Sequence, residues 1–374
     1  MRCPSLRPTW AEINLANFRS NLETVGRLIP PETGILAVVK ANGYGIGAME
    51  ASKAALAVPR VLGLAVATPD EALELRDNGI QGLVLVLGPV TPEAAVVMAE
   101  REVSFAATSV EGVRAAQQAA HATGKKVKIH LKIETGMGRV GMTPGRELGE
   151  ALASLSDAPD VVVEGVFTHF AVSDTDKVYT SHQMDTFEIA LGQLSQAGIR
   201  PRFRHAANSA AVLDFPRSHL DLVRPGIVLY GSYPDQSLSG KADIKPVLSL
   251  LSRVSHVKRV PAGYSVGYGR TYITPRSTTI ATVPIGYADG YPRLLSGRGS
   301  VLIRGKRFPL AGRVCMDQIM VDVGDEAVEV GDLVTLIGTQ GSETITVDEV
   351  AALSETIAHE VLTGIGSRVP RTYV

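Results

Sequence analysis

The sequence of 374 residues has few cysteines and no long apolar run. Its two cysteines, Cys3 and Cys315, have no cysteine or histidine at metal-ligand spacing, which argues against a disulfide framework and against a zinc site. No apolar stretch approaches the roughly 18 residues of a membrane span, and the N-terminus lacks the apolar core of a signal peptide. We therefore expect a cytoplasmic protein with no metal and no membrane partner.

Net charge is also nearly absent. The 37 Lys and Arg residues are balanced by 38 Asp and Glu residues, which leaves a formal charge of −1. Without a long basic run there is no electrostatic reason to expect a nucleic acid as partner. A small molecule is the expected ligand.

Eight short apolar runs alternate with segments long enough for helices. They lie at 36–40, 61–66, 83–88, 103–108, 127–134, 161–170, 203–208 and 222–230. Eight strands separated by helices are typical of a (β/α)8 barrel. Helix starts are visible too, because Thr68-Pro69-Asp70-Glu71 combines an N-cap, a first-turn proline and a capping-box glutamate, and Thr91-Pro92 repeats the start.

After about residue 241 strands follow one another without helices between them. The apolar runs are 247–260, 278–287, 300–305, 314–323 and 332–338, and a helical period extends from Val347 to Thr363. We expect a (β/α)8 barrel domain over residues 1–240 and a β-rich domain over 241–374, with residues 1–15 able to pair with the second domain.

The active site of a parallel barrel lies at the carboxyl ends of its strands. Lys40 follows the apolar run LAVV, where loss of hydration lowers the pKa of an amine and makes it a Schiff-base candidate. A lysine that extends from a strand end into solvent is the alternative explanation. Ser209 and Gly226-Ile227, after the last two strands, could hold a phosphate, although Ser209 and Gly226 taken alone fit an N-cap and a turn glycine better. A reactive lysine beside a phosphate site indicates pyridoxal 5'-phosphate.

Short motifs around these residues, and others along nearly the whole chain, together resemble those of the alanine racemases, which are fold-type III pyridoxal-phosphate enzymes. The motifs are AVVKANGYG (37–45), HLKIETGMGRVG (130–141), GVFTHFA (165–171), HAANSAA (205–211), RPGIVLYG (224–231), VGYGRTY (266–272), PIGYADGYPR (284–293) and GRVCMDQIMVDV (312–323). The resemblance implies an isomerase that supplies D-alanine for peptidoglycan and works as a homodimer.

Two bases are implied by the resemblance. Lys40 carries the cofactor and exchanges the α-proton of the D-enantiomer, while Tyr268 of the partner subunit exchanges the proton of the L-enantiomer. Inverting a stereocentre requires one base on each face, because a single base returns the proton to the side it left. A chain through His169 to Arg224 would favour the phenolate form of this tyrosine.

The remaining contacts are also implied by the resemblance. The phosphate-binding residues are Tyr44, Ser209, Gly226 and Ile227, with Asn208 nearby. Arg139 and the backbone of Met316 receive the substrate carboxylate. Arg224 faces the pyridine nitrogen and can only donate, so that nitrogen stays unprotonated and the cofactor withdraws less charge, which limits side reactions such as transamination.

Four further residues have auxiliary or structural interpretations. The lysine that matches Lys132 is often carbamylated in relatives and then holds the arginine that matches Arg139. Tyr287 lies near the substrate entrance in the family or packs within the β-rich domain. Cys315 is structural in our interpretation, and Asp317 is auxiliary to the second base. His169 alone would also fit a hydrogen-bonded core histidine.

One departure affects the site. The family usually has a tyrosine near the phosphate and the substrate side chain where this chain has His359. Imidazole is smaller than phenol, so we expect the phosphate contact to persist and the side-chain selectivity to shift, with alanine as first substrate and serine as a secondary one.

Three other functions compete with racemisation. An amino-acid decarboxylase of the same fold type would place a carboxylate at the pyridine nitrogen and use a cysteine from the partner, whereas this chain has Arg224 and Tyr268. A non-enzymatic pyridoxal-phosphate carrier would need only the barrel. An aldolase that uses Lys40 without a cofactor leaves the phosphate site unexplained.

Overall fold

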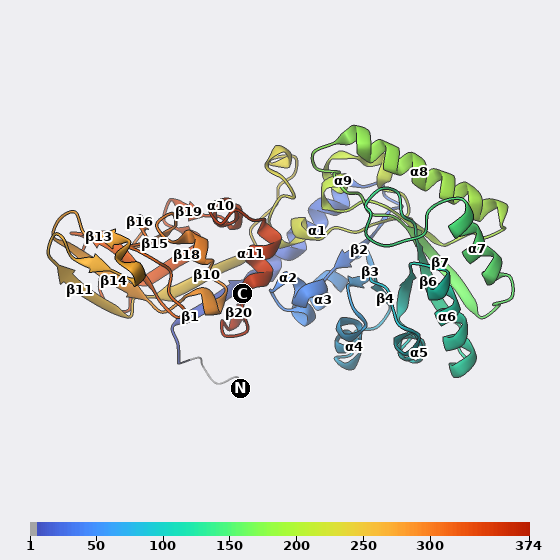
Figure 1. Cartoon of the computed structure of the whole chain (residues 1–374), viewed down its shortest axis with the longest axis horizontal. Coiled ribbons are helices and arrows are strands. Elements are labelled where there is room, and N and C mark those ends of the chain that lie inside the picture. The colour runs from blue at the N-terminus through green and yellow to red at the C-terminus, as the bar shows by residue number, and fades with distance from the viewer. Residues whose placement is uncertain (1–5) are drawn as a thin grey trace.

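The computed structural model describes residues 6–374, so Cys3 lies outside the described residues. Two lobes lie side by side along the long axis of the molecule (Figure 1). One lobe is a closed barrel of eight strands, and the other consists mostly of strands. Both parts of the predicted fold class are therefore confirmed.

The barrel strands coincide with the eight predicted runs. They are β2 (Gly34–Val38), β3 (Val61–Val66), β4 (Leu83–Val86), β5 (Ser104–Ala107), β6 (Val127–Lys132), β7 (Val161–Phe167), β8 (Phe203–His205) and β9 (Leu222–Val223). All neighbours pair in parallel, and β9 closes the barrel against β2. Every residue of β2 is buried, as expected for a strand covered on both faces.

Several predicted runs extend beyond the strands that they contain. Lys40, His169, Asn208 and Arg224 lie just after the last residues of β2, β7, β8 and β9 rather than within the strands. Because parallel strands all end at one mouth of the barrel, these four residues share that mouth.

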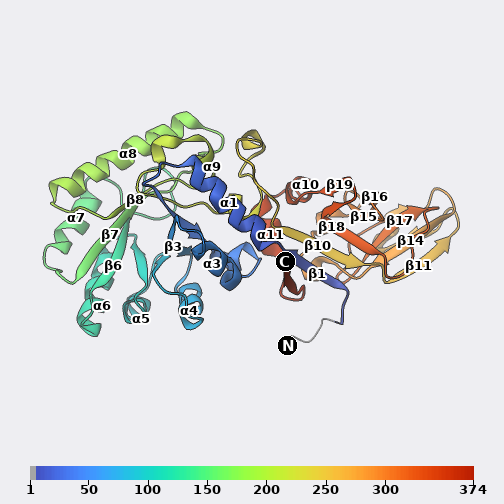
Figure 2. The ribbon, with the colours of Figure 1, turned by 180° about the vertical axis from the view of Figure 1, so that it is seen from behind.

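Helices surround the barrel, and Figure 2 shows α8 and α1 on its outer side. They are α1 (Leu15–Leu28), α3 (Ala48–Leu56), α4 (Pro69–Asp77), α5 (Pro92–Glu100), α6 (Val110–Thr123), α7 (Arg146–Leu155), α8 (Lys177–Gln196) and α9 (Ser209–Asp214). The predicted capping box of α4 is confirmed, since Thr68 Oγ1 accepts from the Glu71 amide and the Glu71 carboxylate accepts from the Thr68 amide. Among residues 6–374 no helix has both the length and the apolar character needed to cross a membrane.

Within residues 6–374, the second lobe contains three sheets. The largest has the order β16-β15-β18-β10-β1-β20, with β19 on β18, and the smaller ones are β11-β14-β17 and β12-β13. The bounds are β1 (Thr9–Ile13), β10 (Leu248–Arg253), β11 (His256–Val260), β12 (Ser265–Val266), β13 (Tyr272–Ile273), β14 (Thr278–Val283), β15 (Ser300–Ile303), β16 (Lys306–Pro309), β17 (Ile319–Gly324), β18 (Leu333–Gln340), β19 (Glu343–Ile345) and β20 (Arg371–Tyr373). Residues 9–13 thus belong to a sheet made otherwise by the C-terminal part of the chain. The domain boundary at 240/241 stays a prediction.

The prediction of one continuous helix from Val347 to Thr363 is wrong. The structure has two helices, α10 (Val347–Leu353) and α11 (Ala358–Gly364). Glu355 has φ of +54°, a left-handed conformation that cannot continue a right-handed helix. The break turns α11 toward the barrel, where the carbonyl of Leu362 lies against Gly45.

Candidate active site

A cavity of about 590 Å³ opens at the carboxyl ends of the barrel strands. Its walls come from the loops after the strands and from α11. Eleven residues singled out in the sequence line it, namely Lys40, Tyr44, Lys132, Arg139, His169, Asn208, Ser209, Arg224, Gly226, Ile227 and His359. The roles assigned to these residues stay predictions, but the fold brings them to one place.

Lys40 begins a short left-handed turn, α2 (Lys40–Tyr44). The next four residues, Ala41, Asn42, Gly43 and Tyr44, all have φ between +50° and +59°. Such a conformation costs roughly 1–2 kcal/mol for each residue other than glycine. The turn is stabilised from outside, because Glu71 Oε1 accepts from the Ala41 amide at 2.6 Å and Asn42 Oδ1 accepts from the Ala48 amide at 2.9 Å. Strain maintained in this way is typical of functional sites.

The electrostatic surroundings of Lys40 favour a neutral amine. Burial and the nearby guanidinium of Arg139 lower the pKa of Lys40, while the carboxylate of Glu71 acts in the opposite direction. A neutral amine is the nucleophilic form, so the position suits a Schiff-base lysine.

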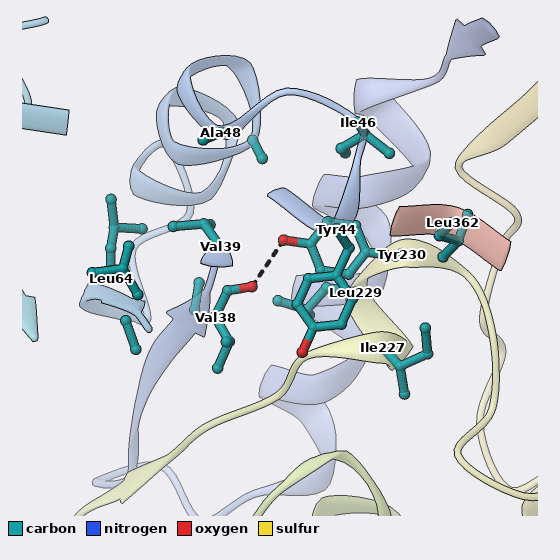
Figure 3. Packing of buried hydrophobic residues seen from close by; sticks show 14 of the residues in the cluster. Val38, Val39, Tyr44, Ile46, Ala48, Leu64, Ile227, Leu229, Tyr230 and Leu362 are labelled. Atoms are coloured by element: carbon teal, nitrogen blue, oxygen red, sulfur yellow. Dashed lines mark hydrogen bonds between the residues drawn. The ribbon is translucent and has the colours of Figure 1, made fainter. Parts of the chain in front are cut away.

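Tyr44, at the end of the turn, is fixed by a second tyrosine. Its ring stacks on Tyr230 with centroids 4.3 Å apart, and the Tyr230 hydroxyl donates to the carbonyl of Val38 at 2.8 Å, the dashed line in Figure 3. Burial raises the pKa of Tyr44, so the phenol is a hydrogen-bond donor. A Cβ at Gly226 would clash with the Tyr44 hydroxyl, and glycine therefore leaves the approach between them open.

The predicted phosphate-binding residues surround this point. Ser209 Oγ accepts from the Gly226 amide at 2.9 Å, which leaves its own proton available to a ligand. The side chain of Asn208 caps α9 by accepting from the Ala211 amide at 3.0 Å. Lysine and arginine side chains in the cavity wall outnumber carboxylates, with Lys40, Lys132, Arg139 and Arg224 against Asp174. This set of donors and cations fits an anionic cofactor with a phosphate group.

Arg224 lines the cavity and is almost fully buried. It donates to the carbonyls of Thr168 at 2.7 Å and Ala206 at 3.0 Å, and its Nη2 lies 3.5 Å from His169 Nδ1. Burial and Arg139 lower the pKa of Arg224 to about 9. Burial and Arg224 together keep the pKa of His169 well below its usual value, so this imidazole is neutral.

Lys132 is a second buried amine beside the same cations. Its Nζ donates to the carbonyl of Ile133 at 2.8 Å. Burial and the charge of Arg224 lower the pKa of Lys132 to about 7. The loop after β6 then folds around Glu134, whose carboxylate accepts from the amides of Gly136 and Arg139. Arg139 reaches the cavity from this loop.

His359 enters the cavity from α11. Its ring centroid lies 5.8 Å from that of Tyr44, with the planes inclined by 43°. Burial and the charge of Lys40 lower the pKa of His359. The imidazole is therefore neutral beside the residues predicted to bind phosphate.

The other predicted site residues lie in the second lobe and do not line this cavity. Tyr268 is 70% exposed and is flanked by Gly267 and Gly269, whose φ angles of +74° and +72° are accessible mainly to glycine. It precedes β13, which Figure 1 shows at the end of the β-rich lobe remote from the barrel. In a single chain, β13 thus lies far from α2, the turn that Lys40 begins (Figure 1).

The other predicted site residues of the second lobe lie on two loops, around residues 287 and 315–317, that are hydrogen-bonded to each other. The amide of Tyr287 donates to the carbonyl of Cys315 and the amide of Ala288 to that of Met316, both at 3.0 Å. Met316 is 52% exposed. The carboxylate of Asp317 pairs with Arg368 at 2.7 Å. The chain therefore presents two groups of candidate residues, one in the barrel mouth and one on the surface of the other lobe.

Sequence reasoning missed residues that contact the predicted ones. Glu71 supports the turn after Lys40, Tyr230 supports Tyr44, and His205 contacts Arg224. His130 and His205 both occur in motifs quoted from the sequence, and two histidines within apolar strands were a signal that could have been followed.

Comparison with known proteins agrees with this geometry. The family model described as "Alanine racemase, N-terminal domain" matches residues 13–234, and "Alanine racemase, C-terminal domain" matches residues 247–373. The chain belongs to the alanine racemase family. It is accordingly a racemase, an enzyme of the isomerase class.

Similar alanine racemases are known from several bacteria. The protein of Carboxydothermus hydrogenoformans is 46% identical, and the alignment covers 99% of this chain and 100% of that one. A solved alanine racemase from Bacillus anthracis with bound L-Ala-P has a TM-score of 0.93 and 41% identity, covering 100% of this chain and 96% of that one. A histidine racemase from Leuconostoc mesenteroides is also similar, with a TM-score of 0.90 and 30% identity over 100% and 99% of the two chains.

Proposed function

We propose that this racemase interconverts L-alanine and D-alanine with pyridoxal 5'-phosphate as cofactor, and that it works as a homodimer whose two active sites are each completed by the other subunit. The separation of Lys40 from the exposed Tyr268 within one chain carries the proposal. The cytoplasmic location expected from the sequence and a supply of D-alanine for peptidoglycan are parts of the same proposal.

The residues of the barrel mouth would hold the cofactor. Tyr44, Ser209 and the amide of Ile227 would donate to its phosphate, and Gly226 would lie beside it with its amide donating to Ser209 Oγ. Asn208 would lie next to these residues, and Arg224 would donate to the ring nitrogen of the cofactor. When bound, the cofactor withdraws electrons from the α-carbon of an attached amino acid and so acidifies the α-hydrogen.

Two bases then exchange the proton. The lowered pKa of Lys40 leaves its amine able to take a proton at one face. Tyr268 of the partner subunit would act at the other face, where the exposed phenol becomes enclosed by the second chain. His169, neutral and 3.5 Å from Arg224, would connect the phenol to a fixed positive charge.

The substrate carboxylate would be received by Arg139 and by the backbone of Met316 of the partner subunit. The amine of Lys132 has a pKa of about 7 and is therefore partly neutral near that pH. The neutral form would react with carbon dioxide and release a proton, and the resulting carbamate anion would hold Arg139 in place. Tyr287, Cys315 and Asp317 would lie around the same entrance. His359 would contact the phosphate and limit the space for the substrate side chain.

A mixing experiment tests the shared site. We expect Lys40→Ala and Tyr268→Phe each to lose about 10²–10⁴-fold in activity. When the two inactive proteins are unfolded and refolded together, half of the dimers are mixed and each has one intact site, so about a quarter of the wild-type activity returns. Mixing Lys40→Ala with the double variant Lys40→Ala, Tyr268→Phe restores nothing and is the matched control. Continued inactivity of the first mixture, with dimers demonstrated by sedimentation, would rule out the shared site.

The cofactor is tested separately. The purified protein should have a visible absorbance band that borohydride abolishes, and the Lys40→Ala variant should lack it. A colourless wild-type protein that does not gain the band on incubation with pyridoxal 5'-phosphate would contradict the proposal.

A further inference from the structure

A row of hydrogen bonds crosses the barrel interior and ends at Arg224. His205 Nδ1 lies 3.0 Å from Arg224 Nη1, and His205 Nε2 lies 2.8 Å from His130 Nδ1. His130 Nε2 in turn lies 3.3 Å from the Glu164 carboxylate. Both histidines are fully buried, and neither has a role in the proposed chemistry.

Only one arrangement of protons satisfies this row. A guanidinium can only donate, so His205 must accept at Nδ1 and carry its proton on Nε2. That proton is donated to His130 Nδ1, which leaves the proton of His130 on Nε2, facing Glu164. Burial holds the pKa of both imidazoles below the usual value, so each ring has one proton. All donors therefore point from Arg224 toward Glu164.

The far end of this row is a carboxylate, that of Glu164. Burial alone would raise the pKa of Glu164, but hydrogen bonds from His130 and Ser104 and the charge of Lys128 bring it to about 2. Ser104 Oγ donates at 2.6 Å, and Lys128 Nζ lies 3.3 Å away. The carboxylate is thus a permanent, largely buried anion.

Arg224 has no carboxylate as a direct partner in the described part of the chain. Within residues 6–374 it forms no salt bridge with a carboxylate, and the hydrogen bonds that it donates go to carbonyls and to imidazole nitrogens. The charged and titratable groups that face it or share its cavity are mostly cationic or neutral: Lys40, Lys132, Arg139, His169 and His359, with Asp174 and Glu134 as the acids. A buried cation among cations depends on any anion linked to it.

A glycine in β7 makes space for this row of side chains. A Cβ at Gly165 would clash with the ring of His130. This glycine belongs to the motif GVFTHFA, which also contains His169. Glycine at this position is therefore explained by the space that the His130 ring requires.

We propose that Glu164 is a positioning residue for the racemase reaction, and that through His130 and His205 it keeps Arg224 charged and fixed in orientation. The inference rests on the proposed function, in which Arg224 faces the cofactor ring. Glu164 does not line the cavity that would hold the substrate and the cofactor. Its effect reaches them through two imidazoles with a single allowed tautomer.

The first test observes the protons directly and does not depend on activity. The chain has 8 histidines, so selective ¹⁵N labelling of histidine in the holoenzyme gives few ring signals, which His130→Asn and His205→Asn assign. We expect both rings to be neutral and protonated on Nε2 from about pH 6 to pH 9. A proton on Nδ1 of His205, or a positively charged ring, would overturn the proposal.

The second test removes the charge and retains the shape. In Glu164→Gln, the alkaline limb of the kcat/KM profile should move to lower pH by about one unit, because a cation without its counter-charge loses its proton more readily. Glu164→Asp should restore the wild-type profile. Glu188→Gln, which neutralises a surface carboxylate paired with Arg217, is the control and should not move it. An identical profile for Glu164→Gln and wild type would overturn the proposal.

These outcomes are distinct from failure of the proposed function. If the wild-type protein does not racemise alanine, the proposed function is ruled out, but the tautomers of His130 and His205 can still be measured by NMR. If Glu164→Gln does not fold, the ring signals of the wild type decide the matter alone.

Discussion

The ring of Tyr44 lies on the ring of Tyr230, with planes inclined by only 19°. Tyr230 is buried and hydrogen-bonded to the backbone of β2, and it supports the phenol of Tyr44 directly beside Gly226. A Cβ at Gly226 would clash with the Tyr44 hydroxyl, so the close approach of these two residues at the proposed phosphate site can be tested by adding a single carbon.

Gly226→Ala should displace the Tyr44 hydroxyl and weaken cofactor binding at least about tenfold, since overpacking costs about 1–3 kcal/mol. Retention of the cofactor during dialysis, followed by visible absorbance, measures this. Gly149→Ala is the matched control, because a Cβ there meets nothing within 4 Å. Equal retention in the two variants would show that the approach at Gly226 does not matter.

The buried Lys132 predicts a dependence of stability on pH. Its folded-state pKa of about 7 lies below the ordinary value of 10.5, so between these values the unfolded chain binds a proton that the folded chain lacks. Stability from this group therefore rises with pH above about 7, by up to about 1.4 kcal/mol per pH unit. Lys132→Met should remove that slope, whereas Lys126→Met, on the surface, should not. Denaturant unfolding at about pH 7 and pH 9 in buffer free of carbon dioxide measures the slopes; equal slopes in wild type and Lys132→Met would contradict the prediction.

His359 predicts an altered choice of substrate. His359→Tyr enlarges the side chain beside Tyr44 and should lower kcat/KM for serine relative to alanine by about tenfold, the scale of one additional atom in a pocket. Circular-dichroism assays with both amino acids give the ratio. His121→Tyr, on the exposed side of α6, serves as control. Identical ratios in His359→Tyr and wild type would show that the departure is neutral.

Arg224 predicts a suppressed side reaction. Arg224→Glu replaces a group that can only donate by one that can protonate the ring nitrogen of the cofactor, so half-transamination should increase relative to racemisation. The ratio of pyruvate formed to alanine racemised measures this. An unchanged ratio, in protein shown to be folded and loaded with cofactor, would count against the role of Arg224.

Local chemistry made much of the barrel predictable. Apolar runs identified all eight strands, and Thr68 and Thr91 marked helix starts because N-caps depend only on neighbouring residues. The break at Glu355 was missed because the apolar period of α10 continues in phase into α11. The break occurs at Glu355, which has a positive φ. A glutamate does not predict a positive φ from sequence, as a glycine or an asparagine would.

Residues of the site were predictable where they stand in motifs at strand ends, as Lys40 and Arg224 do. Their supporting contacts were not, since Tyr230, Glu71 and Glu164 act across distances in the sequence that no periodicity reveals. The resemblance alone predicted that Tyr268 lies away from Lys40 of the same chain. The spacing of residues in a sequence does not indicate whether a side chain acts in the active site of its own subunit or in that of the partner.

The first described strand has a consequence for how the protein is made. β1 pairs with β10 on one side and with β20, at the very end of the chain, on the other. During synthesis the barrel strands are complete while both neighbours of β1 are still missing. The strands of the barrel can therefore pair during synthesis before the sheet of β1 is complete, because that sheet also requires residues 371–373.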